Sequence, residues 1–454
     1  MSFARWRASG GEAAVIGLAR SGVAAGLLLR REGIPVYASD LAPQPDKTVG
    51  ERGLAALRAA GATVSLGGHD LARIARAALC VVSPGVPPAA PPLQAARQGG
   101  VPIVSELDVG FAGLPGTRFA VITGTNGKTT TTALTGHLMI AGGLRTVTAG
   151  NIGRPLSQVA LDGDRPEWVA LEISSFQLHD TNDLVPTIGA TTNLAPDHLD
   201  RYTSLDDYYA DKDRLYLHAN ETACWVVNAD DPEVMRRAEG RAGTQLRFSL
   251  QRRADAWYRR DERELCLYDE RLISRDALAL LGDHNVANAL CAALVATRAG
   301  AAVEEVGAGL ASFRPLPHRL EPVRTVDGVL WVNDSKATNV ASTRVAVQAL
   351  ERPFVLLLGG RHKGEPYTSL ADAAGTRCRA VLAYGESREL VVEDLGERLP
   401  VTLMGTDFAA VVGEARRLAR PGDAVLLSPA CSSYDMFQNY EERGGQFRQL
   451  VEGM

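Results

Sequence analysis

Three long stretches of the chain repeat one rhythm: a short apolar run, a turn that contains glycine, and then a helical pattern. The apolar runs that open or continue these stretches include residues 13–16, 119–122 and 330–332. Strands that alternate with helices are joined by crossover connections, so this rhythm predicts parallel sheets covered by helices. We therefore expect an α/β fold with a sheet in each stretch.

The length and two breaks in the rhythm predict three domains. A chain of 454 residues has room for about three domains of ~150 residues each. Residues 107–116 carry the glycine and proline that are typical of linkers, and residues 313–317 carry Pro315 and Pro317 close together. We place the domains at residues 1–106, 107–315 and 316–454.

Composition excludes several classes of protein. With 48 Lys+Arg against 53 Asp+Glu, the net charge of -5 gives no reason to expect a nucleic-acid partner. No apolar run approaches the ~18 residues of a membrane span, and the N-terminus lacks the pattern of a signal peptide. The six cysteines lie far apart without a CxxC pair, which argues against a disulfide framework and a zinc knuckle. We expect a cytoplasmic, monomeric enzyme that binds small-molecule substrates.

Lysine is rare in this chain. Only five of the 48 basic residues are lysines, and the other 43 are arginines. An ammonium group has uses that a guanidinium cannot replace, so each lysine is a candidate functional residue. A coding bias that leaves a few surface lysines is the alternative. The five are Lys47, Lys128, Lys212, Lys336 and Lys363.

A glycine-rich loop with the sequence TGTNGKTT follows the apolar run 119–122 and precedes a helical pattern. Its glycines let backbone N–H groups converge on a phosphate, and the helix N-terminus favours negative charge. Lys128 would contact the β- and γ-phosphates, and the Thr129 hydroxyl would bind Mg²⁺. The strict P-loop pattern fails because residue 122 is Ile, and a glycine-rich turn with a stray lysine is the alternative. The expected ATP-binding residues here are Gly124, Thr125, Asn126, Gly127, Lys128, Thr129 and Thr130.

A second glycine-containing turn, residues 17–22, follows the first apolar run and resembles a degraded dinucleotide fingerprint. Ala19 replaces the middle glycine. Asp40 lies where a ribose-binding acid is expected. Taken alone, this pattern fits a packing turn as well as a ligand site.

Three further side chains follow predicted strands or lie in helical segments. Glu172 ends the apolar run 168–171, where a carboxylate could bind Mg²⁺. His198 follows another strand, but an isolated histidine is more often neither ligand nor catalyst. Spacing alone predicts that Lys212, in the amphipathic segment 205–217, is a solvated helix lysine.

Ordered motifs from residue 15 to residue 450 resemble those of the Mur ligases, ATP-dependent amide-forming enzymes of peptidoglycan precursor synthesis. They include GTNGKTT, GNIG at 150–153, LEISSFQL at 171–178, GDHNVANA at 282–289 and NDSKATN at 333–339. The segment ACSSYDMFQNYEERGGQF at 430–447 resembles the D-glutamate-adding branch of the family. The resemblance implies a Rossmann-like N-terminal domain, a central P-loop-type ATPase domain with a mainly parallel sheet, and a Rossmann-like α/β C-terminal domain.

The implied reaction joins D-glutamate to UDP-N-acetylmuramoyl-L-alanine through an acyl phosphate, with ATP and Mg²⁺. Lys128, Glu172, His198, Lys212 and Asn151 form the implied catalytic set. Thr129, Glu172, His198 and a carbamylated Lys212 form the implied metal set, which replaces the interpretation of Lys212 from spacing.

The resemblance also assigns binding residues to each ligand. Asn288, Arg319 and Asp334 complete the ATP set. The UDP-substrate set is Gly17, Leu18, Ala19, Arg20, Ser21, Gly22, Asp40, Ser83, Pro84 and Gly85. The D-glutamate set is Lys336, Thr338, Lys363, Ser433, Tyr434 and Tyr440. His362 differs from the family pattern, because relatives often have an acidic residue at this position.

Two other classes of function stay open at this point. The first is the same chemistry with another amino acid or acceptor, such as L-glutamate or a folyl-polyglutamate. The second is a nucleotide-binding regulator or a Rossmann oxidoreductase. A non-catalytic regulator is disfavoured because the implied catalytic residues are all present: Lys128, Glu172, His198 and Lys212. An oxidoreductase is disfavoured because Ala19 replaces a glycine of the dinucleotide fingerprint.

Overall fold

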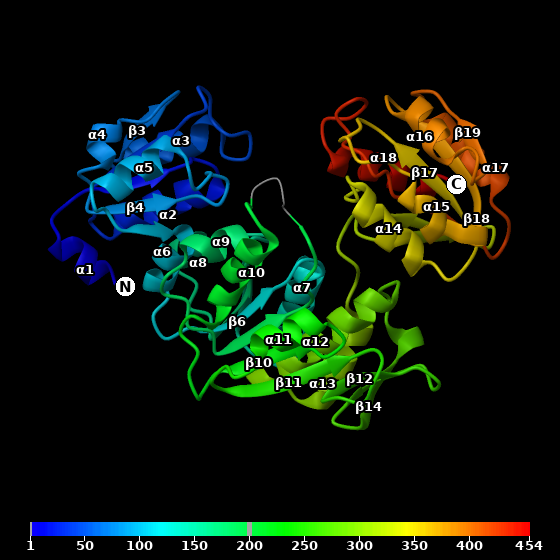
Figure 1. The fold of residues 1–454 in the computed structure, drawn as a ribbon, viewed down its shortest axis with the longest axis horizontal. Helices are drawn as coiled ribbons and strands as arrows, with labels where there is room; N and C mark the ends of the chain where they lie inside the picture. The colour runs from blue at the N-terminus through cyan, green and yellow to red at the C-terminus, as the bar shows by residue number, and fades with distance from the viewer. Residues whose placement is uncertain (1, 198–201) are drawn as a thin grey trace. The chain divides into compact units, whose positions relative to one another are not determined.

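The computed structural model describes residues 2–197 and 202–454, and its strands form three sheets (Figure 1). The chain divides into two compact units. Unit 1 comprises residues 1–275 and 287–311, and unit 2 comprises residues 276–286 and 312–454. Unit 1 contains two of the sheets and unit 2 contains the third.

The first sheet of unit 1 is parallel throughout, with the strand order β3-β2-β1-β4-β5. Alternate residues of β1 enter different cores: Val15 packs with α2, α3 and α6, whereas Ile16 packs with α4 and α5 (Figure 1). Helices therefore cover both faces, as the sequence rhythm predicts. The elements are α1 (Phe3–Ala8), β1 (Ala13–Ile16), α2 (Arg20–Arg31), β2 (Val36–Asp40), α3 (Gly50–Ala59), β3 (Thr63–Leu66), α4 (Leu71–Ile74), β4 (Leu79–Val82), α5 (Pro91–Gln98), β5 (Ile103–Ser105) and α6 (Glu106–Gly113).

The second sheet of unit 1 has the order β14-β13-β12-β11-β10-β9-β6-β8-β7. The strands from β7 to β12 are parallel, and β13 and β14 add an antiparallel edge. The elements are β6 (Arg118–Thr123), α7 (Lys128–Ala141), β7 (Thr146–Gly150), α8 (Leu156–Leu161), β8 (Trp168–Glu172), α9 (Ser175–Asp180), β9 (Ile188–Thr191), α10 (Leu205–Asp213), η1 (Arg214–Tyr216), β10 (Cys224–Asn228), α11 (Pro232–Ala238), β11 (Thr244–Ser249), β12 (Ala256–Arg259), β13 (Glu264–Leu267), β14 (Glu270–Ser274), η2 (Arg275–Ala277), α12 (Asp283–Ala299) and α13 (Val303–Ser312).

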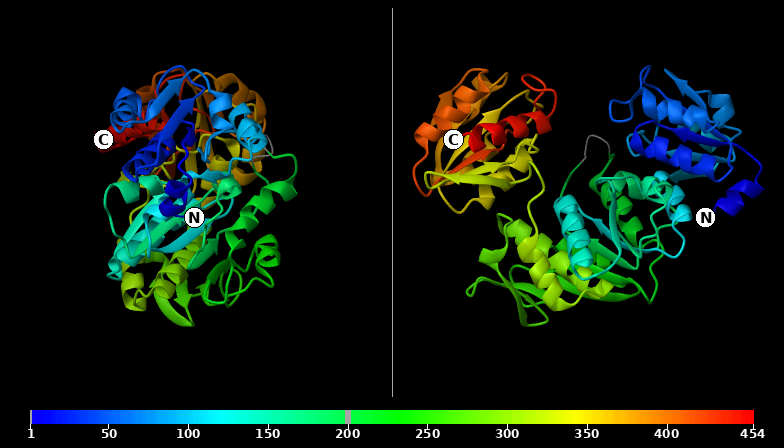
Figure 2. Two further views of the ribbon diagram at one scale, coloured as in Figure 1. Left: turned by 90° about the vertical axis from the view of Figure 1, so that its left-hand side faces the viewer. Right: turned by 180° about the vertical axis from the view of Figure 1, so that it is seen from behind.

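The sheet of unit 2 has the order β15-β16-β20-β17-β18-β19, and only its edge strand β15 is antiparallel among the described residues. Phe447 of the C-terminal helix α18 packs with α17 in one core, and residues of α14, α15 and α16 form the other. These helices lie around the sheet in the yellow to red part of the chain (Figure 2). The elements are β15 (Glu321–Val326), β16 (Val329–Asn333), α14 (Val340–Ala349), β17 (Phe354–Gly359), α15 (Ser369–Ala374), η3 (Gly375–Arg377), β18 (Cys378–Tyr384), α16 (Arg388–Leu395), β19 (Val401–Leu403), α17 (Phe408–Leu418), β20 (Ala424–Leu427) and α18 (Tyr440–Glu452).

Each sheet brings predicted motifs together at the carboxyl ends of neighbouring strands. In the first sheet, β1 and β4 pair, and residues 17–22 and 83–85 follow them. In the second, β6 lies between β8 and β9, so the phosphate loop adjoins Glu172. In the third, β20 lies between β16 and β17, so the loops that follow these three strands converge. Ligands gather at such points in open α/β sheets.

The first predicted linker is wrong. Residues 107–116 contain most of helix α6, whose Leu107 and Val109 are buried in the core. A capping box at Ser105 and Asp108 starts this helix. The second predicted linker, 313–317, has no helix or strand. Across the described residues, no helix is both long and apolar enough to cross a membrane.

Candidate active site

The phosphate loop connects β6 to the N-terminus of α7, as predicted. Gly124 and Gly127 have φ values of +135° and +81°, in the region that favours glycine. A Cβ at Gly124 would lie 2.1 Å from Thr192 Oγ1, and a Cβ at Gly127 would lie 2.3 Å from Asn288 Oδ1. Glycine is therefore required at both positions. Asn288 also accepts a hydrogen bond from Thr131 Oγ1 at 3.1 Å, which places this predicted ATP ligand beside the loop.

Hydrogen bonds from the phosphate loop to the loop after β9 hold the phosphate loop in place. Asn193 accepts hydrogen bonds from the backbone N–H of Thr125 at 2.8 Å and, through its side chain, from that of Asn126 at 2.9 Å. Thr129 and Thr130 lie in the first turn of α7 and are half-buried. His198 lies outside the described residues.

Two lysines meet at one carbonyl oxygen. Lys128 Nζ donates to Gly124 O at 3.0 Å, and Lys212 Nζ donates to the same oxygen at 2.7 Å. The side chain of Lys212 is buried, and the residue is only 4% exposed. The interpretation of Lys212 as a solvated helix lysine is therefore wrong. Its side chain reaches Thr123 Oγ1 and Gly124 O at the end of β6, a contact that spacing along the chain does not reveal.

Burial lowers the pKa of Lys212 well below its usual range, and the neighbouring charge of Lys128 lowers it further. Asp197, Asp211 and Glu172 oppose this shift. Desolvation disfavours the charged ammonium, as does a like charge nearby. The site therefore favours a neutral amine at Lys212.

Glu172 ends β8 beside the phosphate loop and is 1% exposed. Its Oε1 accepts a hydrogen bond from Asn151 Nδ2 at 2.8 Å, whereas its Oε2 is buried without a partner among the described residues. A buried carboxylate oxygen without a partner is costly. This oxygen has the chemistry of a ligand for a divalent cation.

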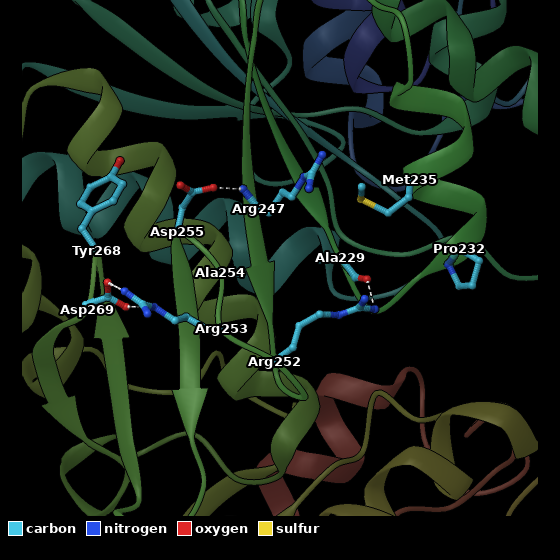
Figure 3. A pocket seen from close by; sticks show the side chains of 10 residues that line it. All are labelled: Ala229, Pro232, Met235, Arg247, Arg252, Arg253, Ala254, Asp255, Tyr268 and Asp269. Carbon is cyan, nitrogen blue, oxygen red and sulfur yellow. Dashed lines mark hydrogen bonds and ion pairs between the residues drawn. The ribbon is translucent and has the colours of Figure 1, made fainter.

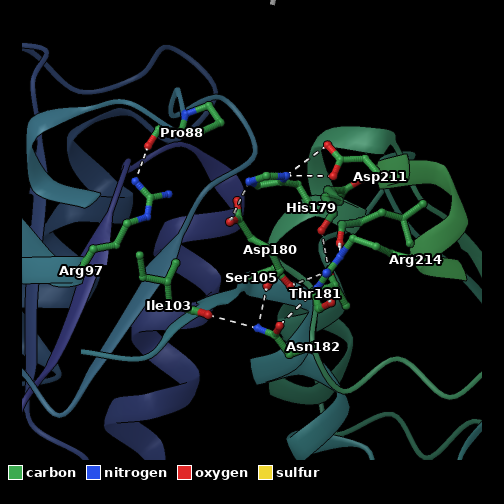
Figure 4. Close-up of polar contacts among 12 residues, drawn as sticks. Pro88, Arg97, Ile103, Ser105, His179, Asp180, Thr181, Asn182, Asp211 and Arg214 are labelled. Atoms are coloured by element: carbon green, nitrogen blue, oxygen red, sulfur yellow. Dashed lines mark hydrogen bonds and ion pairs between the residues drawn. The ribbon is translucent and has the colours of Figure 1, made fainter. Parts of the chain in front are cut away.

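Helix α10, which carries Lys212, is tied to α9 by side chains that the motifs did not single out (Figure 4). Asp211 Oδ1 lies 2.9 Å from His179 Nδ1. Arg214 donates to the carbonyl oxygens of Leu178 at 2.6 Å and Thr181 at 2.8 Å. The hydrogen bond to Asp211 is the main cause that raises the pKa of His179. Sequence offered only one signal for this contact, the charged residues around Lys212.

The predicted UDP-substrate residues form one loop cluster. Ser83 Oγ donates to Gly17 O at 2.8 Å, and Asp40 Oδ2 accepts from the backbone N–H of Leu18 at 2.6 Å. A Cβ at Gly22 would lie 1.8 Å from Gly17 O, so glycine is required there. Arg20 donates to Gly153 O at 3.1 Å, which connects this cluster to the GNIG motif. The exposed or half-buried members are Gly17, Ala19, Arg20, Ser21, Asp40, Pro84 and Gly85.

In unit 2, Arg319 and Asp334 are neighbours. Asp334 accepts hydrogen bonds from Leu320 N at 3.0 Å and Ser428 Oγ at 2.8 Å. Burial raises the pKa of Asp334 to about 7, while these hydrogen bonds and the charge of Arg319 oppose the shift. The carboxyl group of Asp334 therefore already holds the loop that carries Arg319.

The predicted D-glutamate residues lie on three loops of unit 2, except Tyr440, which begins α18. Lys363 Nζ donates to Thr338 Oγ1 at 3.2 Å. Lys336 Nζ lies 4.1 Å from the centroid of the Tyr440 ring. Ser433 is buried, whereas Tyr434 is 66% exposed. His362 Nδ1 lies 3.0 Å from the hydroxyl of Tyr367, so it braces the loop beside Lys363.

A separate open pocket lies on the edge of the second sheet of unit 1 (Figure 3). None of its lining residues belongs to the predicted sets. Arg253 pairs with Asp269, and Arg252 donates to Ala229 O at 2.6 Å. These two arginines of the pocket are therefore already bound within the protein. The lining residues are Ala229, Pro232, Met235, Arg247, Arg252, Arg253, Ala254, Asp255, Tyr268 and Asp269.

Comparison with known families and structures agrees with this arrangement. Three family models match in order: "Mur ligase MurD-like, N-terminal domain" at residues 11–105, "Mur ligase middle domain" at 122–296, and "Mur ligase, glutamate ligase domain" at 318–431. Among solved structures, the UDP-N-acetylmuramate-alanine ligase MurC of Thermotoga maritima matches with a TM-score of 0.61 at 17% identity, covering 98% of this chain and 99% of that one. That similarity shows the fold.

Two curated relatives are similar over nearly their whole length. The UDP-N-acetylmuramoylalanine--D-glutamate ligase of Myxococcus xanthus is 41% identical, over 98% of this chain and 99% of the relative. The enzyme of the same name from Anaeromyxobacter dehalogenans is 42% identical, over 96% of each chain. On these matches and the three family models, the chain belongs to the Mur ligase family.

Proposed function

We propose that this chain is an ATP-dependent ligase that adds D-glutamate to UDP-N-acetylmuramoyl-L-alanine in peptidoglycan precursor synthesis. One observation carries the proposal most directly: the phosphate loop, Glu172 and Lys212 converge at the carboxyl ends of β6 and β8. The names of the relatives at 41% and 42% identity support the acceptor and the amino acid.

To form an amide, a carboxylate must lose one of its oxygens, and this requires a better leaving group than oxide. A substrate carboxylate oxygen attacks the γ-phosphorus of ATP, the bond to the β,γ-bridging oxygen breaks, and ADP leaves. The amine of D-glutamate then attacks the acyl carbon, phosphate leaves and a proton is released. Carboxylate and phosphate repel each other in the first step, so cationic groups must offset their charge. Lys128 and the N-terminus of α7 are placed to do so.

Family membership implies ATP and Mg²⁺, and the residues fit a divalent cation. The unpartnered Oε2 of Glu172 and the hydroxyl of Thr129 at the start of α7 would hold it, together with His198 as a further proposed ligand. When bound, the cation neutralises phosphate charge. Asn151 orients the Glu172 carboxylate through its 2.8 Å hydrogen bond.

We infer that Lys212 becomes a carbamate, in which its neutral amine forms a bond to the carbon of CO₂ and releases one proton. The lowered pKa supports this, because only the unprotonated amine is a nucleophile. The anionic product would place a negative charge beside the Lys128 ammonium, which lies at the same carbonyl oxygen. It would then serve as a further ligand toward the metal.

The remaining assignments extend this proposal. The domains are residues 1–106 for the UDP-substrate, 107–315 for ATP, and 316–454 for glutamate and ATP. The enzyme acts as a monomer in the cytoplasm and contributes to cell-wall biogenesis, cell shape and division. Arg319, Asp334 and Asn288 hold ATP, and Lys363, Thr338, Lys336, Ser433, Tyr434 and Tyr440 hold D-glutamate.

The test is phosphate release with ATP, Mg²⁺ and UDP-N-acetylmuramoyl-L-alanine, comparing D- and L-glutamate. We expect release and amide product with D-glutamate. If product formed with L-glutamate and not with D-glutamate, the proposed amino-acid substrate would be wrong. No release with either, together with activity on a folate substrate, would overturn the proposal.

A further inference from the structure

Arg443 is a buried cation to which neither the motifs nor the implied roles assign a function. It lies in the first turns of α18, and its side chain is fully buried (0% exposed). Its Nε donates to Ser335 Oγ at 2.9 Å, and its Nη2 donates to Ser335 O at 2.8 Å. Both Nη atoms also donate to Cys431 O at 3.2 Å. One guanidinium therefore joins the loop after β16 to the loop after β20.

The third loop of the glutamate set packs against the same group. A Cβ at Gly360 would lie 3.3 Å from Arg443 Nη1 and 2.4 Å from Ser432 O. Arg361 and Ser432 exchange backbone hydrogen bonds of 2.9 and 3.1 Å. The loop that carries Lys363 is thereby held against the loop that Arg443 anchors, two residues before Ser433.

The charge of Arg443 has no direct counter-ion. Its four hydrogen bonds go to carbonyl and hydroxyl oxygens, and within residues 2–197 and 202–454 no carboxylate makes an ion pair with it. Burying a charge without an opposite charge is unfavourable, and its field reaches further in a protein interior than in water. The Ser335 hydroxyl also donates to Tyr440 O at 2.8 Å, so the guanidinium is held in one orientation.

We propose that Arg443 is a positioning residue of the amino-acid subsite. Its planar fork holds the loops of Lys336, Ser433 and Lys363 in register, so that their side chains can meet the two carboxylates of a dicarboxylate amino acid. Lysine cannot reproduce the fork, because an ammonium is a point donor. This inference rests on the proposed function, which supplies glutamate as the ligand of these loops.

The test separates the two half-reactions. Hydroxylamine can replace glutamate: its amine attacks the acyl phosphate, phosphate leaves and a hydroxamate forms. Hydroxamate formation therefore reports on ATP and UDP-substrate without the amino-acid subsite. Arg443→Lys and Arg443→Met are compared with the wild type in this assay and in amide formation at varied D-glutamate.

We expect hydroxamate formation and the KM values for ATP and UDP-substrate to stay within about threefold in both variants. The KM for D-glutamate should rise about 10-fold in Arg443→Lys and about 100-fold in Arg443→Met, as expected for loss of charge-assisted hydrogen bonds. Arg417→Gln, a change in a surface arginine on α17 that pairs with Glu414, is the matched control and should leave every value unchanged.

One outcome would overturn the proposed function, and a different outcome would overturn the role of Arg443. If the wild type forms neither hydroxamate nor amide, the proposed function fails. If the wild type is active and Arg443→Met keeps its KM for D-glutamate, the role of Arg443 is overturned. Should Arg443→Met lose both reactions through misfolding, Ser335→Ala decides, because it keeps the guanidinium and removes only the hydroxyl that accepts from Nε and donates to Tyr440 O. It should raise the KM for D-glutamate about fivefold with unchanged hydroxamate formation, and an unchanged KM would overturn the inference.

Discussion

Lys128 and Lys212 donate hydrogen bonds to one atom, the carbonyl oxygen of Gly124, from 3.0 and 2.7 Å. Burial, and after it the charge of Lys128, lowers the pKa of Lys212 well below its usual range. The two hydrogen bonds join the phosphate loop and helix α10 at the point where the acyl phosphate is proposed to form.

Lys212→Ala should lower kcat by on the order of 100- to 1000-fold, the range for loss of one electrostatic contact to a reacting group. Short carboxylates such as acetate should restore part of the activity, because they can occupy the space of a carbamate. Steady-state rates with and without acetate measure this. Lys47→Ala, which changes an exposed lysine, is the control and should behave as the wild type. Full activity of Lys212→Ala would refute the carbamate.

A carbamate should be visible directly. With ¹³C-labelled bicarbonate, the wild type should show a carbamate carbon resonance that Lys212→Arg lacks, since a guanidinium does not form this adduct under these conditions. Lowering the pH through the depressed pKa of Lys212 protonates the amine, so the resonance should weaken toward acid. A spectrum identical in both proteins would contradict the assignment.

Gly127→Ala should weaken ATP binding at least about 10-fold. Its Cβ would lie 2.3 Å from Asn288 Oδ1, so either the loop or a proposed ATP ligand must move. Gly143→Ala is the matched control: its φ of +77° imposes a similar strain of about 1–2 kcal/mol, but no atom lies within 4 Å of its Cβ. Titration calorimetry with ATP compares the two. Equal losses in both variants would show that strain alone is responsible.

Glu106→Gln should reduce the pH dependence of stability. Burial raises the pKa of Glu106 to about 7, although Ser157 N donates to its side chain at 2.5 Å. Because the folded-state pKa lies above the unfolded value, the folded chain binds more protons between about pH 4.5 and 7. Its stability therefore falls as the pH rises through this window, by about 3 kcal/mol for this group.

Thermal denaturation at pH 5 and pH 8 checks the sign. The wild type should lose more of its Tm between the two values than Glu106→Gln. The exposed Glu51→Gln on α3 should match the wild type. A larger loss in Glu106→Gln would contradict the raised pKa.

Local patterns were enough to predict much of the architecture. The apolar runs 13–16 and 119–122 are β1 and β6, and the phosphate loop lies between a strand and a helix as its sequence requires. These predictions succeed because strand periodicity and glycine conformation depend on neighbours along the chain. The same information missed α6, whose apolar residues gain stability only by packing against a core from distant segments.

The sequence by itself determined the three-sheet α/β class, the phosphate loop and the order of the family motifs. Only the tertiary structure decided that Lys212 is buried against Gly124, 88 residues away, and that Arg443 spans Ser335 and Cys431. The physical reason is that a side chain's charge state and role depend on its desolvation and on which atoms face it. Those are properties of contacts between segments far apart in the chain, which no local pattern records.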